Sequence, residues 1–242
     1  MSYWISDANS SKENFRNNEI FITGDIHGNG FTRLRNAEKL GCKILIVCGD
    51  FGYIWNDLKR NKYNLSIISK IGITILFLDG NHENFDILEQ YSISKMFGGD
   101  VQIISQNIIH LLRGQVYTIG NKKIFVMGGA NSTDKEYMIE NNSWWNQEVP
   151  NKKEREKGIL NLKEEGNKIN IILTHTAPSN ILKIMKNAGH RIDEYTDFLE
   201  TINNKIQFEQ WYFGHMHKDI SVDDKHTCVH YKFYDINGKE KI

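Results

Sequence analysis

Short apolar runs alternate with segments of mixed polarity from Glu19 to the end of the sequence. Several of these runs are apolar at nearly every position, a pattern typical of strands that are covered on both faces. Others are rich in the β-branched and aromatic residues that favour strands. Together they predict strands over 19–23, 44–48, 73–78, 116–119, 123–127, 169–174, 210–213 and 228–235.

Segments with helical periodicity occupy much of the chain between the predicted strands. They cover residues 31–40, 56–70, 84–91, 152–166, 179–188 and 193–204. Gly41 and Gly189 follow two of these segments and suit the position after a helix, where glycine is favoured. The alternation predicts β-α-β units in the first half of the chain, whereas the second half favours hairpins. The fold class is therefore expected to be α/β.

One domain accounts for most of the chain. A sequence of 242 residues can bury a sizeable core, and it contains only two prolines, no repeat and no low-complexity linker. Residues 1–18 are polar and lack periodicity, so we expect an N-terminal arm followed by a single domain over 19–242. Residues 129–151 also lack a clear period, and we interpret them as an inserted lid over the functional site.

Composition limits the classes of partner. Thirty basic and thirty acidic residues give a formal net charge of zero, so charge supports neither nucleic acid nor an anionic membrane as a partner. A local basic groove stays compatible with this total. The three cysteines have no zinc-type spacing, and no apolar stretch approaches the length of a membrane span. A cytoplasmic protein without a membrane partner is expected, and the sequence does not indicate its oligomeric state.

Four short motifs follow apolar runs in a fixed order: GDIHG at 24–28, GDFG at 49–52, GNHE at 80–83 and GHMH at 214–217. A fifth apolar run ends at Thr174-His175. Since open α/β sheets place their sites at the C-terminal ends of strands, these side chains are expected to meet at one edge. The candidate metal ligands among them are Asp25, His27, Asp50, Asn81, His175, His215 and His217.

These residue types suit a pair of divalent cations. Carboxylate, amide oxygen and imidazole groups favour manganese or iron, and zinc, nickel or magnesium can replace them. Two ions roughly 3.5–4 Å apart need a bridging ligand, for which a carboxylate is the natural choice. Such a pair lowers the pKa of a bridging water from about 15.7 towards 7 and can hold a phosphoryl oxygen. The motifs therefore favour phosphate ester hydrolysis.

The motifs GDIHG, GDFG, GNHE and GHMH, with a single histidine after a strand, resemble the calcineurin-like metallophosphoesterase superfamily. The resemblance covers roughly residues 19–236, and it is closest to small bacterial and phage-type members. It implies a four-layer α/β/β/α sandwich of two mixed sheets flanked by helices. The metal ions are then expected at one edge of the sandwich.

The resemblance also implies a role for each motif residue. One metal ion would be held by Asp25, His27, Asp50 and His217, and the other by Asp50, Asn81, His175 and His215. Asp50 would bridge the two ions, and the hydroxide between them would attack phosphorus. His82 would assist the leaving oxygen, either as a general acid or as an electrostatic donor.

The sequence departs from the protein Ser/Thr phosphatases of this superfamily. Those enzymes carry an Asp-Arg pair after the second motif, where this chain has Tyr53-Ile54. The missing aspartate would orient the histidine equivalent to His82, so another partner is needed, and Asp86 is a candidate. The missing arginine would bind phosphate, so a protein phosphatase activity is disfavoured.

Other polar residues have both a functional and a structural interpretation. Arg113 and Lys135 are candidates for binding the substrate phosphate, although ordinary surface charge explains them equally well. Trp144-Trp145 can line a pocket or pack the inserted segment onto the core. Glu83 is interpreted as a helix-start residue. The remaining histidines are interpreted as bystanders, with His230 on the solvent face of a strand: His110, His190, His226 and His230.

The sequence therefore predicts a dinuclear metal-dependent phosphoesterase that hydrolyses a phosphate mono- or diester, with a small nucleotide-like substrate. A nuclease is one alternative, and it would need a basic groove lined with aromatic residues. A protein Ser/Thr phosphatase is a second. The third is a binding module on the same fold, whose signature would be a degraded ligand set, and no motif position is degraded here.

Overall fold

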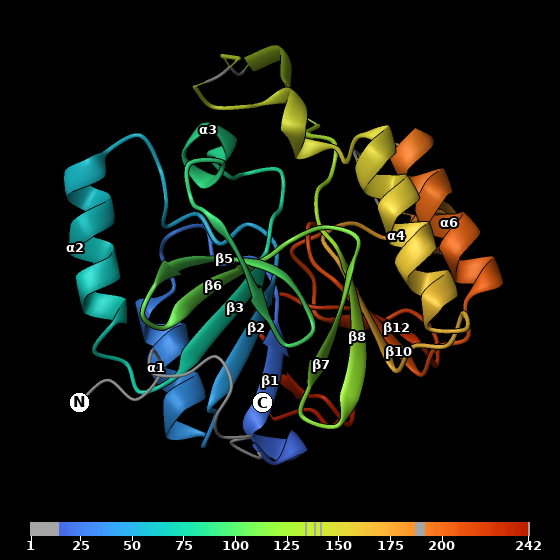
Figure 1. Ribbon diagram of the computed structural model, residues 1–242, viewed down its shortest axis with the longest axis horizontal. Coiled ribbons are helices and arrows are strands. Elements are labelled where there is room, and N and C mark those ends of the chain that lie inside the picture. The colour runs from blue at the N-terminus through green and yellow to red at the C-terminus, as the bar shows by residue number, and fades with distance from the viewer. Residues whose placement is uncertain (1–14, 134, 138, 141, 187–191, 242) are drawn as a thin grey trace.

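Two mixed β-sheets pack face to face and carry helices on their outer faces in the computed structural model of the chain (Figure 1). The structure describes residues 15–133, 135–137, 139–140, 142–186 and 192–241. This arrangement confirms the predicted four-layer α/β/β/α sandwich.

The first sheet has parallel strands at its centre and antiparallel strands at both edges. Central strands of this kind are buried on both faces, which is why their sequences are continuous apolar runs. The strand order is β13 (Tyr234–Asp235), β1 (Ile20–Thr23), β2 (Ile44–Cys48), β3 (Thr74–Leu78), β6 (Ile108–Leu111), β5 (Gly99–Ser105) and β4 (Ile93–Met96).

The second sheet repeats this plan, with parallel pairing from β8 through β9 and β10 to β12 and antiparallel strands outside them. The strand order is β11 (Ile220–Ser221), β12 (His226–Cys228), β10 (Gln210–Phe213), β9 (Ile171–Thr174), β8 (Lys122–Met127) and β7 (Gln115–Ile119).

Alternate residues of the apolar strands enter different cores, because side chains point to opposite faces along a strand. In β1, Ile20 and Ile22 pack between the sheets, whereas Phe21 packs under the helices of the first sheet. Those helices are α1 (Phe31–Lys39) and α2 (Leu58–Ile68), with the short α3 (Phe85–Leu88) nearby. The second sheet is covered by α4 (Lys152–Glu164), α5 (Ser179–Met185) and α6 (Glu194–Lys205).

The predicted strand over 228–235 is wrong. The chain leaves the second sheet after β12, runs through 229–233 without strand structure, and enters the first sheet as β13. Asp219 explains the interruption, because its carboxylate accepts hydrogen bonds from three successive backbone amides, those of His230, Tyr231 and Lys232, at 2.7–3.1 Å. These amides are therefore not available for pairing with a strand.

Two other predictions concern the ends and the insertion. Residues 1–14 of the predicted arm lie outside the described residues, and Asn17 donates to Asn121 and Asn237. In the predicted lid, Trp145 is fully buried and Asn146–Glu148 form a 3-10 turn. Among the described helices, none has the length and apolar character needed to cross a bilayer.

Candidate metal centre

At most one residue separates the start of each motif from the end of a strand, and the strands come from both sheets. The first three motifs follow β1, β2 and β3 of the first sheet. His175 follows β9 and the GHMH motif follows β10 in the second sheet. The fold therefore brings together polar residues, such as His27 and His217, that lie 190 positions apart in the sequence.

Four of the predicted ligands form one tight cluster. Asp25, His27, Asp50 and His217 each offer a ligand atom, and these atoms all lie within 4.8 Å of one another. The Nε2 atoms of His27 and His217 are 2.9 Å apart, and His27 Nε2 lies 3.6 Å from Asp50 Oδ2. The two carboxylates are buried and the two imidazoles are exposed. The cluster is therefore open to solvent on its imidazole side.

Two further predicted ligands meet Asp50. His175 Nε2 lies 3.3 Å from Asp50 Oδ2 and 3.0 Å from Asn81 Oδ1. The other ring nitrogen of His175 donates to the carbonyl of Cys48 at 2.8 Å. This hydrogen bond fixes the ring and leaves Nε2 as the nitrogen that can bind a cation when the imidazole is neutral.

His215 completes the set of motif residues at this edge. Its backbone N–H donates to both carboxylate oxygens of Asp25, at 2.9 and 3.1 Å. Its ring lies 4.9 Å from the ring of His175, centroid to centroid. All seven predicted ligands are thus brought into one region, with Asp25 and Asp50 buried at its base.

The backbone at this centre is strained. Four predicted ligands adopt the left-handed conformation that side chains other than glycine rarely adopt: His27, Asp50, His215 and His217, with φ between 48° and 65°. Neighbouring glycines are also required. A Cβ atom on Gly80 would lie 2.0 Å from Asp50 Oδ1. Strain of this kind gathers at functional sites, where the surrounding structure holds it in place.

His175 and Asp50 perturb each other electrostatically. Burial disfavours the charged form of His175, but the nearby Asp50 carboxylate outweighs it and raises the pKa of His175 to about 9. Burial alone would raise the pKa of Asp50, but His175 and the other imidazoles hold the pKa of this carboxyl well below its usual range. A cation held by His175 and Asp50 would compete with the proton of His175 and would balance the charge of Asp50.

His82 lies beside the cluster. Its backbone N–H donates to Asp50 Oδ1 at 2.8 Å, and its ring contacts that of His27 edge-on at 5.4 Å between centroids. Asp86, the candidate orienting residue, instead accepts a hydrogen bond from Trp145 Nε1 at 2.8 Å. Trp145 therefore packs the inserted segment onto the core. The Asp86 carboxylate serves as its hydrogen-bond acceptor and forms no hydrogen bond with His82.

Glu83 has a different role from the predicted one. It is fully buried and precedes Asn84, which caps α3. Its carboxyl accepts from the backbone amides of Phe51 and Gly52 at 2.7 and 3.3 Å. Burial and the charge of Asp50 raise the pKa of Glu83 well above its ordinary value. Glu83 therefore ties the GNHE motif to the GDFG motif.

The two candidate phosphate-binding cations already have acidic partners. Arg113 is buried, its Nε donates to Asp79 Oδ2 at 2.6 Å, and it also reaches Glu154 at 3.4 Å. Lys135 forms an ion pair with Glu148 and lies over the ring of Trp144 at 4.8 Å. Their predicted role in binding the substrate remains a prediction.

Two residues near the centre escaped the sequence interpretation. Ser132 Oγ accepts from Asn81 Nδ2 at 3.0 Å and donates to Glu148 at 2.7 Å, so it fixes the orientation of the Asn81 amide. His230 is 8% exposed rather than on a solvent face, and its Nδ1 lies 3.9 Å from Asp25 Oδ2. The apolar alternation around His230 predicted a strand with His230 on its solvent face. Because the segment is not a strand, the alternation gave the wrong position for this side chain.

The chemistry of the donors fits a divalent cation. Carboxylate and amide oxygens combined with imidazole nitrogens are the ligands that such ions prefer. The carboxylates are buried and held by backbone amides, which is the outer support that ligating groups typically have. The buried Asp/His cluster therefore suits metal binding.

Comparisons with known proteins place the chain in a family. A family model described as calcineurin-like phosphoesterase matches residues 19–219. The crystal structure of TT1561 from Thermus thermophilus has a TM-score of 0.47 and 13% identity, covering 90% of this chain and 94% of that protein. The comparison with curated proteins returned no match. The family match spans most of the sequence and contains every motif, so the chain belongs to the calcineurin-like phosphoesterase family.

Proposed function

We propose that this protein is a dinuclear metal-dependent phosphoesterase that hydrolyses a phosphate mono- or diester. The observation that carries the proposal is the convergence of two donor groups on Asp50. One group contains His27, at 3.6 Å from its carboxylate, and the other contains His175, at 3.3 Å. A buried carboxylate approached from two sets of ligands is the arrangement that a bridging role requires.

The two sets would each hold one divalent ion, with manganese or iron as the favoured metals. The first set is Asp25, His27, Asp50 and His217, and the second is Asp50, Asn81, His175 and His215. When bound, such ions supply an activated water and neutralise charge on the phosphoryl oxygens.

The protein's own residues orient these donors and handle the leaving group. The backbone amides of His215 and His82 hold the carboxylates of Asp25 and Asp50, and the Cys48 carbonyl orients His175. The ring of His82, beside His27, would give a proton or a hydrogen bond to the leaving oxygen. Assistance of this kind is worth about 10²–10⁴-fold in rate.

The family includes phosphatases that act on proteins. Two buried residues make that activity unfavourable for this protein. Tyr53 and Ile54 occupy the positions of the missing Asp-Arg pair, and each is only 1% exposed. The Tyr53 hydroxyl accepts from the backbone N–H of Gly30 at 2.8 Å. Both side chains are therefore part of the hydrophobic core. These two positions supply no arginine that could bind phosphate.

The test is turnover by metal-stripped protein with and without manganese. The substrates are p-nitrophenyl phosphate and bis(p-nitrophenyl) phosphate, a monoester and a diester with the same leaving group. Manganese-dependent turnover, with about two ions bound per chain by elemental analysis, is the expected result. The preferred substrate separates a phosphatase from a phosphodiesterase. Bound manganese without turnover of either ester would contradict the proposal.

A further inference from the structure

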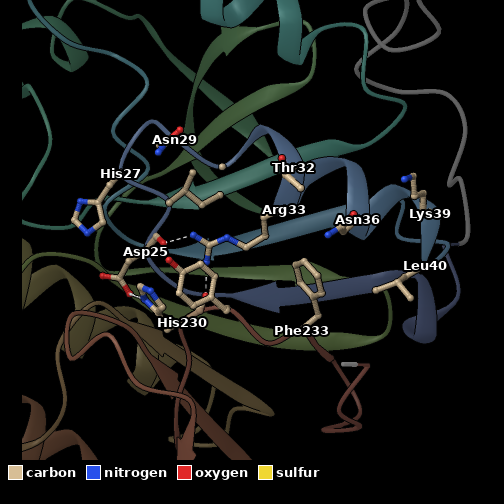
Figure 2. Close-up of a pocket in the computed structure, with 13 residues that line it drawn as sticks. Asp25, His27, Asn29, Thr32, Arg33, Asn36, Lys39, Leu40, His230 and Phe233 are labelled. Carbon is tan, nitrogen blue, oxygen red and sulfur yellow. Dashed lines mark hydrogen bonds and ion pairs between the residues drawn. The ribbon is translucent and has the colours of Figure 1, made fainter.

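A groove of about 680 Å³ begins at the metal centre and continues along α1. Asp25 and His27 lie at one end, and Lys39 and Leu40 lie at the other (Figure 2). One wall is the exposed side of α1, and the opposite wall is the segment 229–233 that connects the two sheets. The groove therefore offers space for whatever is attached to a phosphate bound at the centre.

The 229–233 wall is held in place from two sides. Asp219 accepts from three successive amides of this segment. The guanidinium of Arg33, on α1, donates to the carbonyl of Gly24. It also donates to the carbonyls of His230 and Asp25 (Figure 2). These contacts join the wall to α1 and to the end of β1, so its shape is set before any ligand binds.

Tyr231 is an exposed aromatic residue on this fixed wall. It is 67% exposed, yet the guanidinium of Arg33 lies over its ring at 4.8 Å, and the ring of His230 contacts it edge-on at 4.1 Å. Arg33 covers one face of this ring, so the opposite face of the exposed and oriented ring is the platform on which a planar group can stack.

The α1 wall supplies polar groups along the same groove. Thr32, Asn36 and Lys39 succeed one another away from the metal centre (Figure 2). They lie three or four positions apart, which places them on one face of the helix. Within the described part of the chain, the side chains of Thr32 and Asn36 form no hydrogen bond, so these groups are available to a ligand. Among the described residues that line the groove, the basic Arg33 and Lys39 outnumber the acidic Asp25, a balance of charge that suits an anionic ligand.

His230 lies where the groove meets the centre. The residue is 8% exposed, and its Nδ1 has no hydrogen-bond partner among the described residues. Its ring lies 4.8 Å from that of His217, centroid to centroid. A buried polar atom without a partner is costly, so a site that contains one is usually completed by a bound group.

We propose that this groove binds the organic part of a nucleotide-like phosphate ester, with its planar base stacked on Tyr231 and its polar edges facing Thr32 and Asn36. The inference rests on the proposed phosphoesterase function and names its substrate class. A base in a free nucleotide and a base in a single strand share this chemistry, and the experiment below separates them.

The first test measures binding by calorimetry with metal-stripped, full-length protein. The probes are adenosine 5′-monophosphate and ribose 5-phosphate, which differ only in the base. Wild-type protein is expected to bind the nucleotide about tenfold more tightly, since stacking of a base on an aromatic side chain has about this value. Tyr231→Ala is expected to lose this preference and Tyr231→Phe to keep it.

The matched control is Tyr63→Ala, because Tyr63 is 66% exposed on α2, away from the groove. It should leave the preference unchanged. The inference is overturned if wild-type protein shows no preference for the probe with the base, or if Tyr231→Ala keeps it. Thermal unfolding of each variant shows that the fold is intact.

The second test uses manganese-loaded enzyme and two diesters with the same leaving group, p-nitrophenyl thymidine 5′-phosphate and methyl p-nitrophenyl phosphate. Tyr231→Ala should raise KM about tenfold for the nucleoside ester and leave the methyl ester unaffected. Turnover of both esters with equal effects of the variant overturns the groove assignment but leaves the phosphoesterase intact. Absence of turnover of both diesters and of p-nitrophenyl phosphate contradicts the phosphoesterase itself.

A single-stranded oligothymidylate separates the two sources of the base. Competition by the oligomer that is no stronger than that of thymidine 5′-monophosphate, per molecule, assigns the groove to free nucleotides. Competition that increases strongly with chain length assigns it to a single strand. Failure of both to compete overturns the inference.

Discussion

Asp50 and Asp79 follow adjacent parallel strands, β2 and β3, and both are almost completely buried. In each case burial alone would raise the carboxyl pKa, and in each case nearby cations reverse the shift. Their partners differ. Asp79 meets the guanidinium of Arg113 at 2.5 Å and His110 at 3.2 Å. Among the described residues, the carboxylate of Asp50 forms its hydrogen bonds and ion pairs only with imidazoles and one backbone amide.

This difference separates a structural carboxylate from a candidate ligand. Arg113 is permanently charged, so the Asp79 pair is complete within the chain. The imidazoles around Asp50 can each be neutral and offer a lone pair, so that centre suits an added cation. Burial and a low carboxyl pKa occur at both sites, and the charge of the partner distinguishes them. Four predictions test this distinction.

Asp50→Asn should have the largest effect. An amide cannot bridge two cations as a carboxylate does, so we expect turnover to be abolished and the second metal ion to be lost. The protein should remain folded, because His175 can lose its proton when its anionic partner is removed. Activity assays and elemental analysis check this, with Asp57→Asn as control, since Asp57 caps α2 and asparagine caps equally well. A variant with more than half of normal activity would exclude the bridging role.

His82→Gln should have the next largest effect. Loss of a group that assists the leaving oxygen is expected to lower kcat by about 10²–10⁴-fold. Metal content should be unchanged, because the His82 backbone amide that holds Asp50 is retained. The decrease should be smaller for p-nitrophenolate than for a leaving group of higher pKa. Equal decreases for both leaving groups would argue that His82 acts elsewhere.

Asp79→Asn should affect stability rather than chemistry. Removing one partner of a buried ion pair leaves Arg113 inadequately balanced, which typically costs about 3 kcal/mol or more. Urea unfolding measures this loss, and metal content should stay at the wild-type level. Asp100→Asn is the control, because Asp100 pairs with the exposed Lys95 and Lys157, and such surface pairs contribute about 1 kcal/mol or less. If Asp79→Asn lost metal with little loss of stability, Asp79 would be a metal ligand and not a structural carboxylate.

The smallest expected effect is a loss of unfolding free energy at acid pH, through protonation of Asp79. Burial opposes ionisation of Asp79, but Arg113 and His110 outweigh it and lower its pKa to about 2 from 3.8. A lowered pKa stabilises the folded state above the ordinary value, and the stabilisation is lost as the pH falls towards 2. The unfolding free energy of wild-type protein should therefore fall by about 2 kcal/mol more than that of Asp79→Asn across this range. Parallel pH profiles for the two proteins would contradict this.

The sequence predicted β1, β2, β3, β8, β9 and β10 but not the strands between residues 93 and 111, which include the buried parallel strand β6. β4 reads Ile-Ser-Lys-Met and is largely exposed, since it is an edge strand that only one neighbour covers. Such a strand has no apolar signature of its own. The predicted strand over 228–235 was wrong for another reason. Its alternation is real, but the Asp219 carboxylate, brought close by the fold, takes its backbone donors.

The candidate site divides in a similar way. The motifs identified the residues that the fold brings together around Asp50, because each motif lies at the end of a strand and short-range spacing fixes its place. The partners of Asp79, Asn81 and Asp86 were not predictable. Arg113, Ser132 and Trp145 come from other segments of the chain, and no local pattern marks them.

The sequence by itself thus determined the α/β class, most of the parallel strands and the order of the ligand-bearing motifs, all of which depend on local periodicity and turn chemistry. Only the tertiary structure decided that Arg113 balances Asp79, that Glu83 ties two motifs together, and that His230 and Tyr231 form a wall beside the metal centre. Those contacts join residues distant in the chain, and the free energy of burying or pairing a polar group depends on neighbours that only the folded chain supplies.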